Sequence, residues 1–186
     1  TYIRIWDKSG NILVNNKLVK SITSINDYGD PNVVYDAAAD RFIFVVLYSG
    51  SARKLVVCVS QTADPTGSYY IYTFNSTNGL PDYPKIAVWG NSYFITTNSK
   101  TPQVYALNRT SMLAGATLGA AQLFKMSSFP FNGFQSASPV TQTGLLLQPL
   151  NAPELTLRWA DSSWGSPGGS DHLQFFKFVV YWDNAK

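Results

Sequence analysis

The chain has 186 residues, of which 45% are hydrophobic, 15% aromatic and only 13% charged, a balance that supplies a core and excludes a disordered chain. The net charge is +3 and the basic residues are scattered singly apart from Arg53 and Lys54, which argues against a nucleic-acid-binding face. The longest apolar run, Phe42 to Tyr48, is too short to span a membrane.

Strand patterns follow one another along the chain, as the wealth of aromatic and β-branched residues favours. Tyr2 to Trp6 alternates, a turn follows, and Ile12 to Val14 resumes, which predicts a hairpin. Further strands are predicted at 32–35, 42–48, 55–60, 69–74, 86–89, 93–97, 104–107 and 122–125. Thr110 to Gln122 is alanine-rich but contains two glycines, which predicts a loop with one helical turn.

Two stretches share a pattern, DPNVVYD at 30–36 and YPKIAVW at 83–89. Each places a proline directly before a short apolar strand, where its missing N–H does least harm. Pro31, Pro84 and Pro139 recur at intervals of about 50 residues, which is typical of β-propeller blades built as four-stranded meanders. In the third repeat the second strand is predicted at 155–158, with 145–147 in an insertion.

The predicted fold class is therefore all-β, a β-propeller of four-stranded antiparallel blades. Residues 1–186 form one propeller segment: 1–16 end a blade, 28–75 and 82–126 are two blades, and 136–186 start a further one. Because a closed propeller has at least about four blades, we expect an incomplete slice of about three to four. An open β-sandwich that happens to repeat is the alternative.

Four segments carry a family resemblance: YGDPNVVYDAAADRFIF, VCVSQTADPTGSYYIYTF, LPDYPKIAVWGNSYFITTN and DHLQFFKFVVYW. The chain resembles secreted bacterial β-propeller-like repeat proteins, large exported or cell-surface proteins of which some carry type IX secretion sorting domains. Tyr181-Trp182-Asp183 fits the pattern loosely, and 141–153 departs from it by lacking an acidic loop. The resemblance implies a propeller scaffold and a surface or secreted location, with no reaction and no catalytic residues.

The candidate ligand-binding residues lie where loops enter the innermost strands or carry an aromatic side chain. Loops at strand ends around a propeller axis commonly line its ligand-binding face, and the residues concerned are Asp30, Asp82, Tyr83 and Lys85. Asp82 and Lys85 are equally able to pair with each other. Trp164, in the loop 161–169, is the best candidate for an exposed aromatic platform.

Other reactive side chains favour structural interpretations. Asp36 and Asp40 flank three alanines and are predicted to cap a turn, because two carboxylates are too few for a calcium loop. Cys58 lies inside an apolar strand and is predicted to be a core residue. Ser170, Asp171 and His172 are adjacent in sequence, which is the wrong geometry for a catalytic triad. No catalytic residue, metal or other cofactor is predicted.

The leading functional hypothesis is a non-enzymatic propeller segment of a secreted or cell-surface bacterial protein. It would act in adhesion or in the binding of a glycan or protein ligand at the propeller face. Its other partners would be the remaining blades of the same polypeptide or a larger surface assembly. The alternatives are a propeller-fold glycosidase or lyase, and a structural subunit of an extracellular filament or secretion assembly.

Overall fold

The computed structural model describes residues 1–48, 50, 53–77, 79–98, 103–118, 121–125, 135–136, 154–160, 172–178 and 180–182. Its elements in chain order are β1 (Tyr2–Trp6), β2 (Ile12–Leu18), α1 (Lys20–Thr23), β3 (Asp27–Asp36), β4 (Arg41–Tyr48), β5 (Lys54–Ser60), β6 (Tyr69–Asn75), β7 (Lys85–Trp89), β8 (Ser92–Thr97), β9 (Gln103–Asn108), α2 (Arg109–Leu113), β10 (Gln122–Lys125), β11 (Gln135–Ser136), β12 (Glu154–Ala160) and β13 (His172–Phe178).

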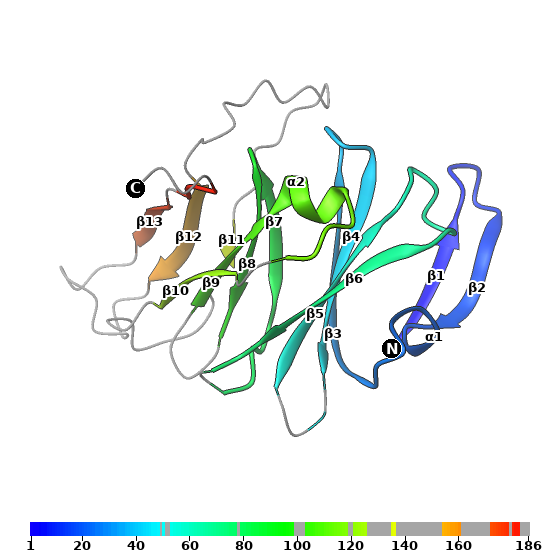
Figure 1. Ribbon diagram of the computed structural model, residues 1–186, viewed down its shortest axis with the longest axis horizontal. Coiled ribbons are helices and arrows are strands. Elements are labelled where there is room, and N and C mark those ends of the chain that lie inside the picture. Colours follow the sequence, from blue (N-terminus) through cyan, green and yellow to red (C-terminus); the bar gives the residue numbers. More distant parts are fainter. Residues whose placement is uncertain are drawn as a thin grey trace.

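The strands form separate antiparallel sheets that follow one another across the molecule (Figure 1). The hairpin β1–β2 stands at one end, beside a first sheet in the order β3-β4-β5-β6. A second sheet has the order β10-β9-β8-β7 and a third the order β11-β12-β13. The prediction of an all-β chain is confirmed. The strands within the described residues close into neither a barrel nor a complete propeller.

Two local features of the first 40 residues differ from the sequence prediction. The short helix α1 was not predicted, since four residues carry no helical periodicity. Pro31 was predicted to precede its strand and instead lies inside β3. The β3–β4 register shifts between Gly29 and Asn32, so Pro31 occupies a β-bulge where no ladder N–H is required.

The first sheet buries both faces of β4 and β5, as the absence of a polar side in 42–48 predicts. Ile43, Val45 and Leu47 face the second sheet, within the main hydrophobic core. Phe44 and Val46 point the other way, into a cluster with Val19, Val56 and Cys58 beside the hairpin. Because strand side chains alternate, a strand apolar at every position needs a neighbour on each side.

The second sheet is covered on both faces as well, and every residue of β8 is buried. Its far face packs Ala87, Phe94, Val104 and Ala106 against Val180, with Trp182 at the edge of this cluster. The Trp182 indole Nε1–H donates to Ser92 Oγ at 3.0 Å. The segment 180–182 therefore returns from beyond β13 to lie on the second sheet.

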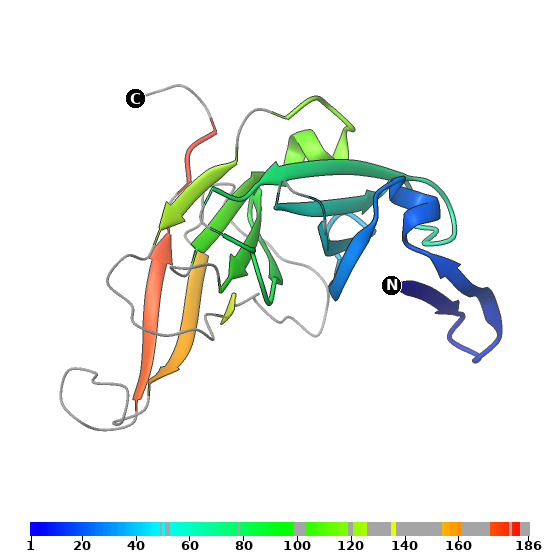
Figure 2. The same cartoon turned by 90° about the horizontal axis from the view of Figure 1, so that it is seen from below.

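The first strands of neighbouring sheets contact one another in sequence, β3 with β7 and β7 with β11 (Figure 2). In the third sheet β12 covers the predicted strand 155–158. Its first strand, β11, ends before Pro139, so the structure places no described strand directly after that proline. Pro139, residues 145–147 and Ser170–Asp171 lie outside the described residues.

Candidate functional site

Three of the predicted ligand residues lie together at the bend that leads into β7. Tyr83 has a positive φ of 52°, and its N–H donates to Asp82 Oδ1 at 2.9 Å. The Lys85 ammonium stands 3.9 Å from the centre of the Tyr83 ring. Among the described residues Lys85 forms no ion pair with Asp82, because it lies over the aromatic face instead. Tyr83 remains 48% exposed.

Asp30 is exposed in the bulge of β3, with a positive φ of 47°. Asn32, two residues further along the chain, joins the two proline motifs directly, since its Oδ1 accepts the backbone N–H of Ile86 at 2.9 Å. The two motif strands therefore lie side by side. No hydrogen bond or ion pair connects Asp30 itself with the Tyr83 bend in the described part of the chain. Trp164 lies outside the described residues.

A buried polar cluster joins the first two sheets at the end of β3. Asp36 is 1% exposed, and its Oδ2 accepts from Tyr93 Oη and Arg109 Nε, each at 2.7 Å. Its Oδ1 accepts from Arg109 Nη2 at 2.9 Å and from the Ala39 N–H at 3.2 Å. The predicted turn cap is thus present. Sequence reasoning missed the bidentate Arg109, because nothing in a 73-residue separation signals the contact.

The electrostatics of this cluster favour a structural role. Burial and the Asp36 carboxylate raise the pKa of Tyr93, so its phenol stays protonated. Burial alone would lower the pKa of Arg109, but its hydrogen bond and charge interaction with Asp36 raise it. Both carboxylate oxygens already accept two donors. The cluster therefore offers no free base for proton transfer.

The described residues offer neither a group of metal ligands nor a reactive thiol. Asp40 accepts the Tyr35 hydroxyl, and within these residues no three His, Cys, Asp or Glu side chains group around a possible metal ion. Cys58 is fully buried, which confirms its prediction as a core residue. Burial also raises the pKa of its thiol, so the nucleophilic thiolate is suppressed.

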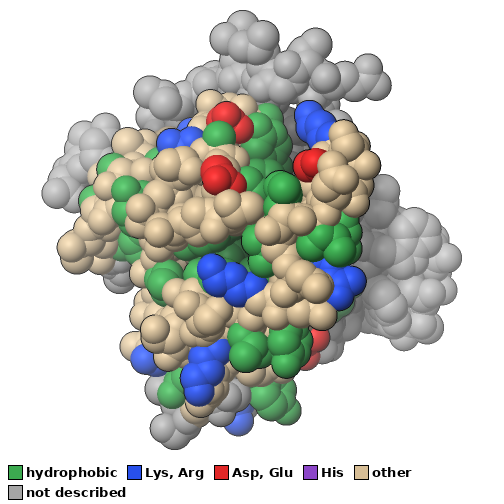
Figure 3. Space-filling model, turned by 90° about the vertical axis from the view of Figure 1, so that its right-hand side faces the viewer, with side chains coloured by type: hydrophobic (Ala, Val, Ile, Leu, Met, Phe, Trp, Pro, Cys, Tyr) green, Lys and Arg blue, Asp and Glu red, His purple; other side chains and the backbone are tan. Residues whose placement is uncertain are grey.

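The most distinctive concave surface lies between the hairpin and the first sheet, and we call it the hairpin groove. It encloses about 420 Å³. One wall is the strand β1, and the other is formed by β3, β4 and the start of β6. Its lining residues are Thr1, Tyr2, Ile3, Arg4, Ile5, Trp6, Val19, Pro31, Val33, Phe42, Phe44, Pro65 and Tyr69. Figure 3 faces this end of the molecule, where hydrophobic side chains reach the surface near basic ones.

Large apolar side chains of the groove remain open to solvent. Tyr2, Trp6 and Val33 are 64%, 51% and 64% exposed. The ring of Phe42 packs against the ring of Tyr35, with 5.0 Å between the two ring centroids. Exposed aromatic side chains grouped around a concavity mark an interaction site more strongly than the same residues scattered singly.

Arg4 is the only charged side chain among the lining residues. Its Nη2 donates to Asn16 Oδ1 at 2.8 Å, and its guanidinium lies 5.6 Å from the Trp6 ring centre. No carboxylate pairs with it in the part of the chain that the structure describes. The groove therefore combines aromatic surface with one positive charge that a ligand can neutralise. The alternating strand pattern of residues 2–6 predicts a hairpin, but it cannot predict which distant residues form the opposite wall of the groove.

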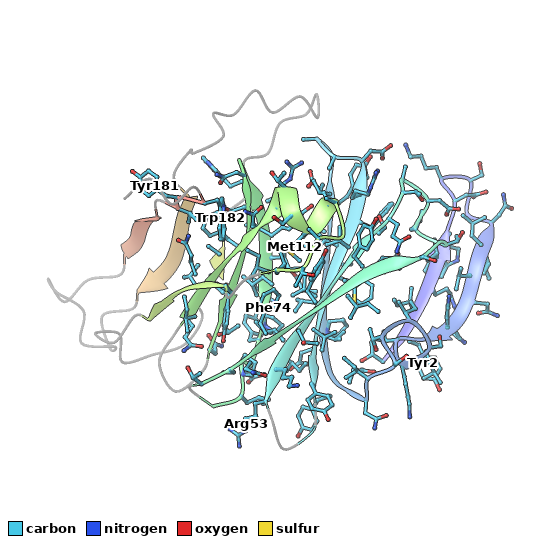
Figure 4. All side chains as sticks on the ribbon, viewed as in Figure 1. Tyr2, Arg53, Phe74, Met112, Tyr181 and Trp182 are labelled. Atoms are coloured by element: carbon cyan, nitrogen blue, oxygen red, sulfur yellow. The ribbon has the colours of Figure 1, made fainter. Side chains whose placement is uncertain are left out.

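A second hollow of about 680 Å³ lies between the outer strand of the first sheet and the segment after α2. It is lined by Ile71, Tyr72, Thr73, Phe74, Asn75, Tyr105, Gly115, Ala116, Thr117, Leu118, Ala121 and Leu123. Figure 4 labels Phe74 and Met112 where β6 approaches α2. The Tyr72 hydroxyl donates to the Met112 carbonyl at 3.0 Å, which joins β6 to α2 beside this hollow. No charged side chain lines it among the described residues.

No protein-family model, curated protein or solved structure matches the chain. Within the described residues, no helix has the length and apolar character needed to cross a membrane. The residues and their geometry therefore carry the functional proposal.

Proposed function

We propose that this chain is a non-enzymatic binding module, a propeller segment of a secreted or cell-surface bacterial protein that acts in adhesion. The hairpin groove is its ligand site, and its ligand is a protein or a glycan. One observation carries the proposal: solvent-exposed aromatic side chains surround a hollow of a size typical for ligand sites.

The packing supports the propeller as scaffold. The inner strands β3, β7 and β11 contact one another successively, as the inner strands of blades do around an axis. The first and second sheets each bury both faces, which radial stacking of blades requires. Completing the ring calls for further blades of the same polypeptide or of an assembly partner.

The chemistry of the groove supports binding over catalysis. Hydrolysis of a glycoside needs two carboxyl groups placed across the bond, and the lining residues supply neither an Asp nor a Glu. Two buried carboxylates lie nearby in sequence, and both are engaged: Asp36 is held by Arg109 and Tyr93, and Asp27 pairs with the Thr1 ammonium at 2.9 Å. Aromatic side chains with few rotatable bonds are well suited to recognition, because they lose little entropy on binding.

The proposal is tested by presenting the purified chain with a glycan array and with a displayed library of short random peptides. We expect specific ligands that Trp6→Ala weakens about tenfold or more, as for an interfacial Trp. Tyr181→Ala is the matched control, an equally exposed aromatic at the opposite end of the molecule (Figure 4). If Trp6→Ala leaves the affinity of every ligand unchanged, or if no ligand is found, the groove is not the binding site.

A second candidate is glycan binding at the Tyr83 bend. It is favoured by the half-exposed Tyr83 ring, which Lys85 holds on one side at 3.9 Å. A sugar ring can stack on such a face while Asp82 and Lys85 supply polar contacts. Glycan-array signals lost in Tyr83→Ala and kept in Trp6→Ala would move the site to this bend.

A further inference from the structure

We propose that the peptide bond between Asp30 and Pro31 is a self-cleavage site, at which the Asp30 side chain cuts its own main chain and water completes the hydrolysis. This inference goes beyond ligand binding and does not depend on the hairpin groove or on the Tyr83 bend. It follows from the backbone at the bulge of β3, from the surroundings of the Asp30 carboxylate and from a comparison with a second Asp–Pro bond in the chain.

The backbone at this bond is held in an unfavourable conformation. Asp30 has a φ of +47°, in the left-handed region that non-glycine residues rarely adopt. The residue before a proline is also biased towards extended conformations with negative φ, because the proline ring crowds its backbone and its Cβ. Asp30 therefore departs from two conformational preferences at once, and cutting the bond relieves the strain that this causes.

The bond is also accessible. In the β3–β4 register the paired positions on either side of it are Gly29 and Asn32, so Asp30 and Pro31 lie in the bulge without a partner on β4. Both residues are exposed, so water reaches the bond. Within the described residues no hydrogen bond or ion pair engages the Asp30 carboxylate, which leaves it free to turn towards its own carbonyl carbon.

The chemistry follows from the two residue types. A carboxylate oxygen of Asp30 attacks the main-chain carbonyl carbon of the same residue and closes a cyclic anhydride. The carbon–nitrogen bond breaks, its electron pair stays on the Pro31 nitrogen, and that nitrogen takes a proton from solvent. Water then opens the anhydride, returns the proton and leaves Asp30 with two carboxyl groups. Proline suits the second position because it has no N–H to attack the side chain instead.

Weak acid promotes this reaction, because the departing nitrogen needs a proton while the attacking carboxyl group must be ionised. The side chains that carry charge in weak acid on β3 and on the strands packed against it, β4 and β7, are Asp27, Asp36, Arg41 and Lys85. None of them is bonded to Asp30 in the part of the chain that the structure describes. The Asp30 carboxylate is therefore not withdrawn from the reaction by an ion pair.

The bond between Asp64 and Pro65 provides a comparison within the same chain. Asp64 is exposed as well, but its Oδ1 accepts from the N–H and from the hydroxyl of Thr66, each at 2.8 Å. These hydrogen bonds lower the pKa of Asp64 and hold its carboxylate in the local turn. Asp64 also has no positive φ. The structure therefore favours cleavage after Asp30 over cleavage after Asp64, although the two dipeptides are identical.

The test incubates the purified chain with protease inhibitors at the most acidic pH at which circular dichroism still shows the native fold. Mass spectrometry identifies fragments that end at Asp30 or begin at Pro31 and follows their formation with time. We expect this bond to be cut roughly tenfold to hundredfold faster than the bond between Asp64 and Pro65, as the strain at a sparsely populated φ implies. In urea at the same pH the two bonds should react at similar rates, because unfolding removes the bulge.

Two variants separate attack by Asp30 from other causes of cleavage. Asp30→Glu keeps the charge but lengthens the side chain, which disfavours ring closure, so cleavage should slow by about tenfold or more. Asp64→Glu is the matched control and should leave the cut after Asp30 unchanged. Equal rates at the two bonds in the native chain, no cleavage after Asp30, or a cut that keeps its rate in Asp30→Glu would each overturn the inference. The ligand tests of the hairpin groove are independent of all these outcomes.

Discussion

Asp36→Asn tests the buried cluster between the first two sheets with almost no change in side-chain shape. In the native cluster each carboxylate oxygen accepts two hydrogen bonds, from Tyr93 and Arg109 on one side and from Arg109 and Ala39 on the other. The amide NH₂ group replaces one of the two carboxylate oxygens of Asp36. Whichever oxygen it replaces, the two groups that donated to that oxygen then face a third donor and lose their acceptor. The guanidinium of Arg109 also loses its only ion-pair partner among the described residues.

The magnitude follows from these losses. Two lost hydrogen bonds cost about 1 kcal/mol each, and leaving a charge without its partner adds to this, for a total of about 3 kcal/mol. Arg109 is 16% exposed, so hydration relieves part of the charge penalty and keeps the total at the low end of the range for broken buried pairs. Since 1 kcal/mol moves Tm by about 2–4 °C in a domain of this size, we expect a fall of about 6–12 °C.

Urea unfolding at neutral pH, followed by circular dichroism, measures the free energy of unfolding. The control is Asp40→Asn in the same turn, where the exposed side chain can still accept the Tyr35 hydroxyl through its amide oxygen and should matter by no more than about 0.5 kcal/mol. A double-mutant cycle with Arg109→Met should give a coupling energy of about 1–3 kcal/mol. A loss below about 0.5 kcal/mol for Asp36→Asn, or additive effects in the cycle, would refute the view that this cluster holds the sheets together.

Three further predictions concern packing and pH. Asn32→Ala removes the acceptor of the buried Ile86 N–H and should lower the free energy of unfolding in urea by about 1–3 kcal/mol, against no measurable change for an exposed asparagine. Gly115→Ala adds a methyl group against the Tyr70 ring at a φ of +67°, so its urea midpoint should fall; an unchanged midpoint would contradict the close approach. Burial raises the pKa of Tyr69 from 10.0 to about 12, so above pH 10 the unfolded chain releases a proton that the folded chain retains. The free energy of unfolding should therefore fall between pH 10 and 12, and Tyr69→Phe should make the fall shallower.

The sequence predicted the strands well, because the patterns that indicate a strand lie in neighbouring residues. The alternation in 2–6, the apolar run 42–48 and the turn residues between them are readable from neighbouring positions. The proline motifs also predicted correctly that 30–36 and 83–89 contain matching strands, which the structure places side by side. The bulge at Pro31 was missed, because Gly29 and Asp30 with positive φ read equally well as a turn.

The candidate site was much less predictable, since it depends on distant residues. The residues Asp82, Tyr83 and Lys85 do lie together, but adjacency in sequence already ensured that. The hairpin groove joins residues 1–6 to Val33, Phe42 and Tyr69, and no local pattern records that apposition. Asp36 shows the same limit, because its turn-capping role is local while its bonds to Tyr93 and Arg109 are not.

The return of Val180 and Trp182 to the second sheet has a consequence for biosynthesis. Ala87, Phe94, Val104 and Ala106 form a face whose cover includes residues synthesised about 75 positions after its last strand residue. On the ribosome that face stays open while the third sheet is still being made. A nascent chain of this kind exposes an apolar sheet surface for seconds at ordinary elongation rates, long enough for ribosome-associated chaperones to bind it or for neighbouring nascent chains to associate.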